Sequence, residues 1–414
     1  MKTRLKQLSR LFQWRTKQLP VLLLSVAAAV LLVACAPFAE HSAGNAAPSA
    51  KGQAADGRDA IGAGKVSRML YGPVAVLPLA NISGTPAPLE KIRAAYIDEL
   101  EQRGIAVLGE EALDDFMARH RYRDTSGIDG GTAKALQEET PAIGVLITTL
   151  ESYQEEFPPK AALSCRLVSA GEMGAEIRWM DGTGLEGDDH PGFFDRGLVR
   201  DSDRLLHITL ARIAESLTRH FAGEEPTMAE PAKRYAPKVM FKDEDFPRQR
   251  PLKAAIIPFL NNSDHKHGAA ILQEHLLKYL SRDPRVQVLE PGTLRQVLYK
   301  YRMLMPVGMS RADAELIASD MPGVDLLITG IVEIYIDSRA AGDIPWVDFY
   351  LMATNRRGKV VWNSRSFNRG DEGVWFFDLG SVKSAYPLAD HMTRAAAAAM
   401  LKPAIAEFRD RKVQ

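Results

Sequence analysis

Two histidines, His265 and His267, have the residue type and spacing that come nearest to a metal site in this chain. Side chains at i and i+2 of an extended backbone point to the same side, so both imidazoles could reach one ion. A zinc site needs further ligands, and the matching loop of an internal repeat carries Gly84-Thr85-Pro86-Ala87 without histidine. We therefore expect a solvated polar loop and no metal, and keep His265 and His267 as candidate ligands.

Residue patterns that mark common catalytic centres are missing from the sequence. It has no Gly-x-Ser-x-Gly, no His-Glu-x-x-His and no clustered cysteines. Gly62-Ala63-Gly64-Lys65 departs from a phosphate-binding loop, since no strand precedes it. Glu110-Glu111 and Asp114-Asp115 suit the positive end of a helix better than acid–base work. We expect no catalytic residue, no cofactor and no enzyme; a metal-dependent enzyme using the histidine pair is the alternative.

The amino terminus has the charge pattern of an export signal. Lysines and arginines come before the first acidic residue, and the segment from Leu19 to Ala34 then carries no charge. That segment is shorter than the roughly 20 apolar residues of a membrane-spanning helix. The pattern predicts a cleaved signal peptide at residues 1–34 rather than an uncleaved transmembrane helix.

Leu32-Val33-Ala34-Cys35 ends this segment and resembles the lipobox of bacterial lipoproteins. The resemblance implies cleavage between Ala34 and Cys35, and fatty acyl chains such as palmitate on Cys35. The membrane would then be a partner through the lipid anchor. Ala36 follows Cys35 where an Asp could stand, which in those families implies the outer membrane, facing the periplasm, with the inner membrane as the alternative.

Cysteine content and charge limit what else the chain can do. Cys165 is the only other cysteine, so a lipid on Cys35 leaves it without an intramolecular disulfide partner. We interpret Cys165 as a small buried strand residue rather than a reactive thiol. Lys plus Arg and Asp plus Glu number 52 each. A chain with no net charge has no overall field for a phosphate polymer, so we expect no nucleic-acid partner.

Residues 35–69 are rich in Ala, Gly and Ser, and the remainder of the chain repeats itself. The first feature predicts a flexible tether with a reach on the order of 30 Å. The matching pairs are Val76–Ser83 with Ile256–Ser263 (offset 180), Val107-Leu108 with Val288-Leu289 (181), Leu146–Thr148 with Leu327–Thr329 (181), and Phe193–Val199 with Phe376–Val382 (183). The repeat predicts two homologous domains, 70–222 and 252–412, joined by a Pro-rich linker, 223–251.

Hydrophobic periodicity and turn residues predict the same order of elements in each repeat. The expected helices are Leu89–Arg103, Glu111–Tyr122 and Arg200–Phe221, then Gly268–Ser281, Thr293–Arg302, one that starts with a capping box at Ser310, and Lys383–Phe408. The expected strands are Val74–Leu79, Ile105–Leu108, Ile143–Glu151, Ala161–Val168 and Ala175–Trp179, then Ala254–Phe259, Val286–Leu289, Asp325–Ile336, Val347–Ala353 and Lys359–Asn363. Crossovers followed by a meander predict an α/β (α+β) fold with a mixed sheet covered by helices in each domain.

Two further sets of residues could bind something. The aromatic set could form a partner-docking patch or the core side of a turn; it consists of Phe193, Phe194, Trp375, Phe376 and Phe377. The polar set stands at the end of each first strand, where α/β folds often hold ligands; it consists of Asn81, Ser83, Asn261 and Ser263. We favour turn formation for the polar set, because Asn and Ser commonly build turns.

Val-Leu-Pro-x-x-Asn-x-Ser at 76–83 and Pro-Gly-Val-Asp-x-Leu-Ile-Thr-Gly at 322–330 resemble a known group of proteins. The group comprises curli-secretion-channel lipoproteins, lipoprotein activators of penicillin-binding proteins, the Pel-polysaccharide lipoprotein and the amino-terminal domain of TolB. The resemblance implies an anticodon-binding-domain-like fold and a non-catalytic scaffold or accessory subunit of an envelope assembly or secretion system. An oligomeric ring or export-channel component is the alternative. The envelope partner is unidentified, and a homo-oligomer is compatible with both.

Overall fold

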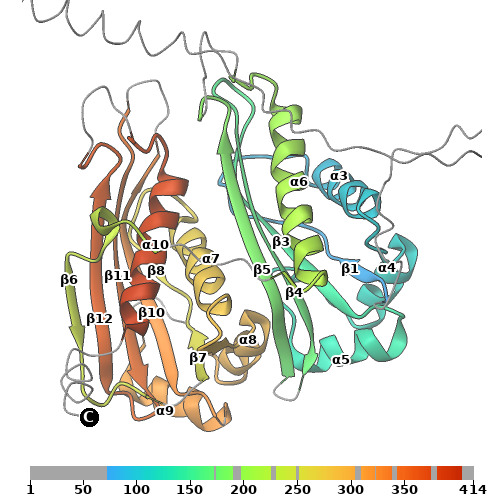
Figure 1. Cartoon of the computed structure of the whole chain (residues 1–414). Coiled ribbons are helices and arrows are strands. Elements are labelled where there is room, and N and C mark those ends of the chain that lie inside the picture. Colours follow the sequence, from blue (N-terminus) through green and yellow to red (C-terminus); the bar gives the residue numbers. More distant parts are fainter. Residues whose placement is uncertain are drawn as a thin grey trace, which may run out of the picture. The chain divides into compact units, whose positions relative to one another are not determined.

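The strands form two separate mixed sheets, each with its own helices, which we call the first and second lobes (Figure 1). The computed structural model describes residues 72–171, 174–189, 197–224, 230–248, 251–303, 309–321, 323–337, 343–373 and 380–402. All of them lie in one compact unit, Lys65–Gln414. The predicted α/β (α+β) class is confirmed.

The first lobe contains a five-stranded sheet in the order β1-β3-β4-β5, with β2 also paired to β3. Its strands are β1 (Val74–Val76), β2 (Ala80–Asn81), β3 (Gly144–Gln154), β4 (Lys160–Gly171) and β5 (Gly174–Glu186). The β1–β3 pair is parallel, whereas β3, β4 and β5 form an antiparallel meander. Crossover and meander are therefore arranged as predicted.

The second lobe contains a seven-stranded sheet in the order β6-β12-β11-β10-β7-β9, with β8 paired to β10. Its strands are β6 (Val239–Lys242), β7 (Leu252–Ile256), β8 (Leu260–Asn261), β9 (Val286–Val288), β10 (Leu326–Ile336), β11 (Trp346–Asn355) and β12 (Val360–Arg369). Here too β7 and β10 are parallel, and β10, β11 and β12 are antiparallel.

Helices cover the sheets on both faces. In the first lobe they are α3 (Leu89–Gln102), α4 (Glu110–Arg119), α5 (Gly130–Glu139) and α6 (Ser202–Phe221); in the second, α7 (Gly268–Ser281), α8 (Pro291–Lys300), α9 (Arg311–Asp320) and α10 (Ala385–Leu401). One core lies between the first sheet and α3 with α6, and a smaller one lies beneath α4 and α5. The second lobe repeats this with α7 and α10 on one face and α8 and α9 on the other. Within the described part of the chain, no helix has the length and apolarity to cross a bilayer.

Helix ends follow the sequence closely where a capping residue marks them. Ser310 accepts a hydrogen bond from the backbone N–H of Asp313, whose side chain accepts one from the backbone N–H of Ser310. This is the predicted capping box, and it satisfies two backbone donors at the start of α9. The predicted helix Gly268–Ser281 matches α7 at both ends.

Strand ends differ more from the predictions. The strands expected at Val74–Leu79 and Ala254–Phe259 end early, at Val76 and Ile256, and a second short strand begins only after the predicted end, at Ala80 and Leu260. Pro78 and Pro258 lie in the gaps, since proline has no N–H for the ladder. The strand expected at Ile105–Leu108 is reduced to an isolated bridge of Val107. In contrast, β5 and β12 run well beyond their predicted ends. The predictions stop too early there because the glycines and polar residues of these strands are typical of loops.

Strand pairing also differs from one match of the predicted internal repeat. Val76 pairs with Leu146, and its counterpart Ile256 pairs with Ile328, so Leu146 corresponds to Ile328 at an offset of 182. The sequence match of Leu146 with Leu327 is therefore wrong by one residue. Such a slip would exchange the two faces of the sheet: Leu146 lies in the core under α3 and α6, whereas Leu327 lies under α8 and α9.

The segment expected as a linker, 223–251, contains regular structure in its described part. A short 3-10 helix spans Lys233–Tyr235, and β6 pairs antiparallel with β12 as an edge strand of the second sheet. Tyr235 and Phe246 are buried in the core of the second lobe. Much of this segment therefore packs as part of that lobe.

The sheets and helices stack in alternating layers (Figure 1). The second sheet is followed by α7 and α10, then by the first sheet, then by α3 and α6. Ala162 and Met180 of the first sheet belong to the same buried cluster as Leu272 and Leu276 of α7. The layer of α7 and α10 therefore contacts both sheets.

Candidate functional site between the lobes

Helix α7 is the element that joins the two lobes. Leu272, Leu276 and Leu280 repeat every four residues and belong to the core of the second lobe. Glu274 and Lys278 instead meet strands β4 and β5 of the first sheet. A helix with apolar residues on one face and charged residues on the other would ordinarily expose the second face to water. Here that face is buried against another sheet.

Arg166 on β4 is the central residue of this interface. Its side chain is 1% exposed and lies against Glu290, which is 0% exposed. The guanidinium donates to both Glu290 oxygens, with Nε–Oε2 at 2.9 Å and Nη2–Oε1 at 3.2 Å. Its Nη1 donates to Glu274 Oε2 at 3.2 Å, and Nη2 also donates to the backbone oxygen of Ser126 at 2.5 Å. One buried cation from the first lobe is therefore shared by two carboxylates of the second.

Charge sharing makes the two carboxylates unequal. Burial alone would lower the pKa of Arg166, but the Glu290 and Glu274 carboxylates raise it overall. Glu290 receives the fork of two hydrogen bonds, which is the strongest geometry for a carboxylate with arginine. Burial raises the pKa of Glu274 to about 7, against the opposing effect of Arg166 and with a further rise from Glu151 and Glu290. Burial therefore moves the pKa of Glu274 into the neutral range.

A second polar contact between the lobes is also buried. His275 Nε2 on α7 lies 3.2 Å from Glu151 Oε2 on β3, and both side chains are at most 1% exposed. The ring of Tyr386 meets the His275 ring edge-on at 4.7 Å between centroids. Burial, together with the Glu151 and Asp390 carboxylates, raises the pKa of Tyr386 well above its usual range. Polar atoms here are enclosed by aromatic and aliphatic groups, which strengthens their interaction.

The loop before α5 is held by α8 of the second lobe. Arg295 donates to the Asp124 carboxylate, to Ser126 Oγ at 2.8 Å and to the backbone oxygen of Gly127 at 2.7 Å. The backbones approach closely: a Cβ on Gly292 would lie 2.4 Å from the nitrogen of Ile128. Glycine at position 292 therefore permits a contact that any other residue would obstruct.

Three more ion pairs surround these buried contacts. Lys160 Nζ lies 2.8 Å from Asp337 Oδ2, Arg282 Nη1 lies 2.9 Å from Asp181 Oδ1, and Lys383 Nζ lies 2.8 Å from Asp188 Oδ2. Each pair joins a residue of one lobe to a residue of the other. The pairs of Arg282 and Lys383 are partly exposed and favour one relative placement of the lobes more than they add free energy. Lys160 is 5% exposed, so its pair belongs to the buried part of the interface.

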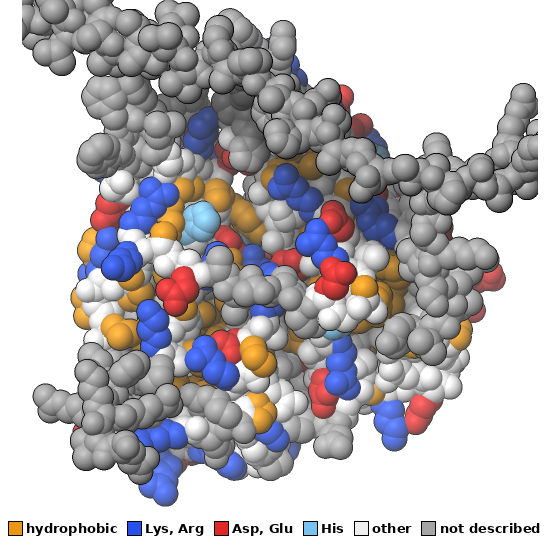
Figure 2. Space-filling model, in the orientation of Figure 1, with side chains coloured by type: hydrophobic (Ala, Val, Ile, Leu, Met, Phe, Trp, Pro, Cys, Tyr) orange, Lys and Arg blue, Asp and Glu red, His pale blue; other side chains and the backbone are white. Residues whose placement is uncertain are grey.

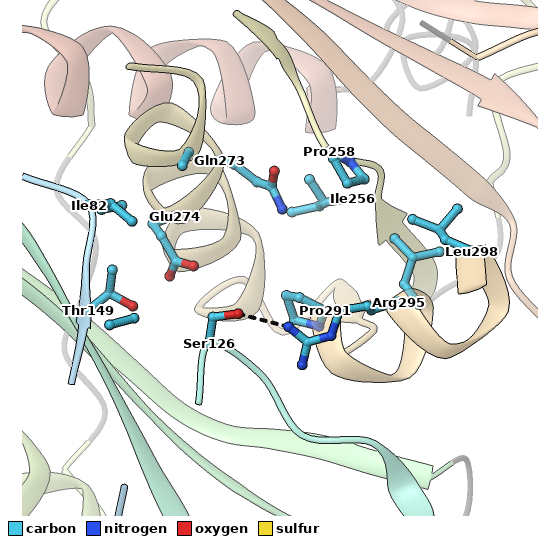
Figure 3. A pocket seen from close by; sticks show the side chains of 13 residues that line it. Ile82, Ser126, Thr149, Ile256, Pro258, Gln273, Glu274, Pro291, Arg295 and Leu298 are labelled. Atoms are coloured by element: carbon cyan, nitrogen blue, oxygen red, sulfur yellow. Dashed lines mark hydrogen bonds between the residues drawn. The ribbon is translucent and has the colours of Figure 1, made fainter. Parts of the chain in front are cut away.

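A cavity of about 280 Å³ opens beside Glu274, between the lobes (Figure 3). Its walls come from β2, β3, the end of β7, α7 and α8, together with the loop at Ser126. The residues that line it are Ala80, Ile82, Ser126, Thr149, Ile256, Pro258, Ala270, Gln273, Glu274, Pro291, Leu294, Arg295 and Leu298. Figure 3 shows Ser126 hydrogen-bonded to Arg295 at its base.

The cavity combines apolar walls with one carboxyl group and one guanidinium. Both charged groups already have protein partners, Arg166 for Glu274 and the loop at Asp124 for Arg295. Neither is placed as a nucleophile beside a base. The arrangement can accommodate a small apolar group or the side chain of a partner protein, and it couples the Glu274 proton to the contact between the lobes.

The candidate metal ligands lie in the loop before α7. His265 Nδ1 accepts a hydrogen bond from the backbone N–H of His267 at 3.3 Å, and the His265 ring packs against Tyr335. Burial, with a smaller effect of Lys266, lowers the pKa of His267. Within the ranges that the structure describes, no three His, Cys, Asp or Glu side chains are grouped to hold an ion.

The polar residues after the first strands bond within their own loops. Asn81 Nδ2 donates to the backbone oxygen of Thr85, and Ser83 Oγ donates to Asn81 Oδ1. Asn261 and Ser263 repeat this arrangement, with His265 supplying the backbone oxygen. These contacts are those of a turn, the interpretation favoured from the sequence.

Cys165 is buried on β4, as predicted. Tyr96 Oη and Thr148 Oγ1 donate hydrogen bonds to its sulfur at 3.4 and 3.3 Å. Burial raises the pKa of the Cys165 thiol to about 11, which disfavours the reactive thiolate. The predicted processing and lipidation residues, Ala34 and Cys35, lie outside the described residues, and so do Phe193, Phe194, Trp375, Phe376 and Phe377.

Sequence reasoning missed the main residues of the interface. Arg166 lies in an apolar stretch, Ala161–Val168, whose pattern predicts a strand and no more. An arginine at an inward position of such a strand is itself a signal, because a buried charge requires an opposite charge nearby. Its partners, Glu274 and Glu290, are more than 100 positions away, and no spacing rule connects them.

No family model matches this sequence, and no curated protein matches it. Solved structures do resemble parts of it. The PelC dodecamer from Paraburkholderia phytofirmans is 12% identical, covering 40% of this chain and 97% of its own, with a TM-score of 0.29. Lipoprotein GNA1162 from Neisseria meningitidis is 18% identical, covering 31% and 90%, with a TM-score of 0.25.

A third neighbour is the LpoB C-terminal domain from Salmonella enterica, 12% identical over 30% of this chain and 87% of its own, with a TM-score of 0.24. Matches of this strength carry no argument about what the present chain does.

Proposed function

We propose that this protein is a membrane-anchored, periplasm-facing lipoprotein that serves as a non-catalytic scaffold or accessory subunit of a cell-envelope assembly or secretion system. The observation that carries the proposal is the use of the strongly interacting charges. Arg166, Glu290 and Glu274 bind one another across the contact between the lobes, and only Glu274 also lines the cavity. A molecule built this way presents a fixed surface to partners, which is what a scaffold requires.

The lipid anchor is the second part of the proposal. It rests on the export signal and on Leu32-Val33-Ala34-Cys35. With residues 35–69 as a tether, the folded part would stand away from the membrane by a distance on the order of 30 Å. The lobes could then reach a partner that is embedded in, or bound to, the same membrane.

The chain is further proposed to be a tandem duplication, with domains at 70–222 and 252–412. Both lobes have the same order of crossover, meander and closing helix. Asn81 pairs with Leu150 and Asn261 pairs with Val332, at equivalent places in the two sheets. A duplicated unit whose copies are joined internally offers two similar surfaces to an assembly.

A photo-crosslinking amino acid placed in living cells tests the scaffold role. We would place it at Phe367, on the exposed face of the second sheet, and as a matched control at Lys134 on α5. A scaffold gives a discrete crosslinked band from Phe367 that contains a protein other than this chain, and none from Lys134; a band that holds only two copies of this chain would not support the scaffold role. Hydrolase or transferase activity in the purified protein, lost on mutation of a described residue, would contradict the proposal.

A further inference from the structure

Among the residues that the structure describes, nothing covers part of one face of the second sheet, and this part carries large apolar side chains. Helices α8 and α9 cover only the part of this face around β7 and the start of β10. The remainder, which we call the bare face, consists of Val239, Phe241, Ile336, Trp346, Tyr350, Arg365 and Phe367. Five of these apolar side chains are exposed, from 37% at Trp346 to 60% at Val239. Figure 2 shows hydrophobic and basic side chains side by side along the edge where Figure 1 places β6 and β12.

The corresponding face of the first sheet is covered by helices α7 and α10 of the second lobe. Leu163 pairs with Leu150 as Phe349 pairs with Val332, so Ser164 corresponds to Tyr350. Continuing across the sheet, Gly182 corresponds to Arg365 and Gly184 to Phe367. In the first lobe this face lies against α7 and α10 of the second lobe. An exposed apolar area of this kind ordinarily marks a contact surface.

The internal interface joins small residues on the sheet to long side chains on the helices. Lys278 Nζ lies 3.5 Å from the backbone oxygen of Gly182. A Cβ on Gly184 would lie 2.4 Å from the Tyr386 ring. Glu274 Oε2 lies 3.5 Å from Ser164 Oγ. Small residues of the sheet therefore leave space that the long side chains of the helices occupy.

Helix α3 occupies the place in the first lobe that α7 occupies in the second, and its outward side chains are smaller than those of α7. The core-facing residues of α3 are Ile92, Tyr96 and Leu100, and those of α7 are Leu272, Leu276 and Leu280. The two sets are 180 positions apart, which is also the offset between Asn81 and Asn261. Glu274 therefore corresponds to Ala94, and Lys278 corresponds to Asp98. Ala94 and Asp98 are both exposed on the outer side of α3.

We propose that the layer of α3 and α6 of a second copy of this chain docks on the bare face, which repeats the internal interface between molecules. Small Ala94 would lie opposite large Tyr350, and Asp98 would lie opposite Arg365, whose guanidinium is partly exposed and also pairs with Asp348 on the same face at 2.8 Å. In the internal contact the large side chain is on the helix and the small one is on the sheet, whereas in the proposed contact the large side chain is on the sheet. Asp98 and Arg365 carry opposite charges. The inference does not depend on the proposed envelope role.

This association is heterologous, because the two surfaces that meet are different. Each molecule keeps one bare face and one free helix layer, so further copies can add in the same direction. Such a contact produces a ring where the rotation closes and a filament where it does not. The alternating layers within one chain are then the repeat of a longer stack.

Cysteine trapping with the full chain, purified in detergent, tests the pairing. Glu274 and Ser164 touch in the internal interface, so their counterparts are replaced as Ala94→Cys in one preparation and Tyr350→Cys in another. Mixing the two under mild oxidation should give a disulfide-linked dimer. Ala94→Cys mixed with Lys134→Cys is the matched control and should give none. A dimer from Tyr350→Cys alone would mean that two bare faces pack together, which overturns the proposal.

The charge contact has its own measurement. Asp98→Lys should weaken self-association by at least about tenfold in sedimentation equilibrium, whereas Glu138→Lys on α5 makes the same charge change and should leave it unaltered. Circular dichroism would establish that both variants are folded. A wild-type protein that stays monomeric at every concentration, with no trapped dimer in the mixture, overturns the proposal.

Discussion

At the scale of single residues, the interface between the lobes depends on one buried cation. Arg166 neutralises two carboxylates and also satisfies a backbone oxygen of the loop at Ser126. Coulomb attraction in such a site has to offset the desolvation of each charge, so the net stabilisation by the complete cluster is modest. Removing one member of the cluster is strongly destabilising, because the remaining charges stay buried without their partner.

Arg166→Met is therefore expected to lower the free energy of unfolding by about 3–5 kcal/mol. Glu290, with no exposed surface, would be left without its cation. Urea denaturation followed by circular dichroism measures the change. Arg219→Met is the matched control, since Arg219 makes an exposed pair with Glu215 and should change stability by less than about 1 kcal/mol. Equal effects of the two substitutions would contradict the buried cluster.

Glu274 makes stability depend on pH. Its pKa is about 7 in the folded chain and about 4.3 in an unfolded one, so the folded state binds the proton more tightly. The resulting stabilisation is complete below the unfolded pKa and is lost as pH rises through about 7. The difference of about 2.7 pKa units (7 minus 4.3) corresponds to at most about 4 kcal/mol.

Glu274→Gln removes this titration while keeping the shape of the side chain. The variant should therefore gain stability relative to the wild type as pH rises from 5 to 8. Urea midpoints of both proteins across that range measure the difference. A difference that does not change with pH would show that Glu274 titrates at an ordinary value.

At the scale of elements, the joint between the lobes requires close approach of two backbones. Alanine is a better helix former than glycine, so Gly292→Ala considered within α8 alone should stabilise. Next to Ile128 the substitution should instead lower the free energy of unfolding, because the added Cβ would lie 2.4 Å from a backbone nitrogen. We expect a loss of about 1–3 kcal/mol, measured by urea denaturation. Gly109→Ala, where a Cβ meets nothing within 4 Å, is the control, and a stabilised Gly292→Ala variant would refute the close contact.

Elements that depend on local chemistry were predictable from the sequence. The capping box at Ser310 and the helix Gly268–Ser281 are in place, since caps and apolar periodicity act within a few residues. The register of β10 was not, because Leu327–Thr329 matches Leu146–Thr148 in sequence one residue away from its structural equivalent. Strand pairing is set by contacts distant along the chain, and similar apolar residues on both faces left the register ambiguous.

The candidate site was predictable only in part, and for the same reason. The turn residues Asn81 and Asn261 act locally and behave as expected. Arg166 and Glu290 meet only because two sheets and a helix layer stack, and neither lobe alone contains the pair. Interfaces within a chain leave a weak trace in sequence: a charge where periodicity predicts an apolar residue.

At the scale of the whole molecule, the proposed anchor would decide where the protein acts. Mass spectrometry of the native protein should find an amino terminus at Cys35 carrying acyl chains, because Leu32-Val33-Ala34-Cys35 follows a charged start and an uncharged segment. Globomycin should lead to accumulation of the uncleaved form. An intact Met1 without a lipid would contradict the anchor and leave the lobe interface untouched.

The two lobes should also unfold as one unit. Ala162 and Met180 of the first sheet lie in the core of the second lobe, and Arg166 is neutralised by that lobe. Separating the lobes would expose this apolar surface and leave buried charges unpaired, at a cost comparable to a large part of the stability of a domain. Opening of one lobe alone is therefore disfavoured.

Native-state hydrogen exchange can measure this coupling. Amides of β3 in the first lobe and β10 in the second are expected to share one opening free energy, equal to the free energy of global unfolding. In Arg166→Met the two values should separate, because each lobe can then open alone. Glu215→Ala on α6 removes only an exposed pair and should keep the values equal. Different opening free energies for β3 and β10 in the wild type would mean that the lobes are independent, and the interface would then be a contact rather than a shared core.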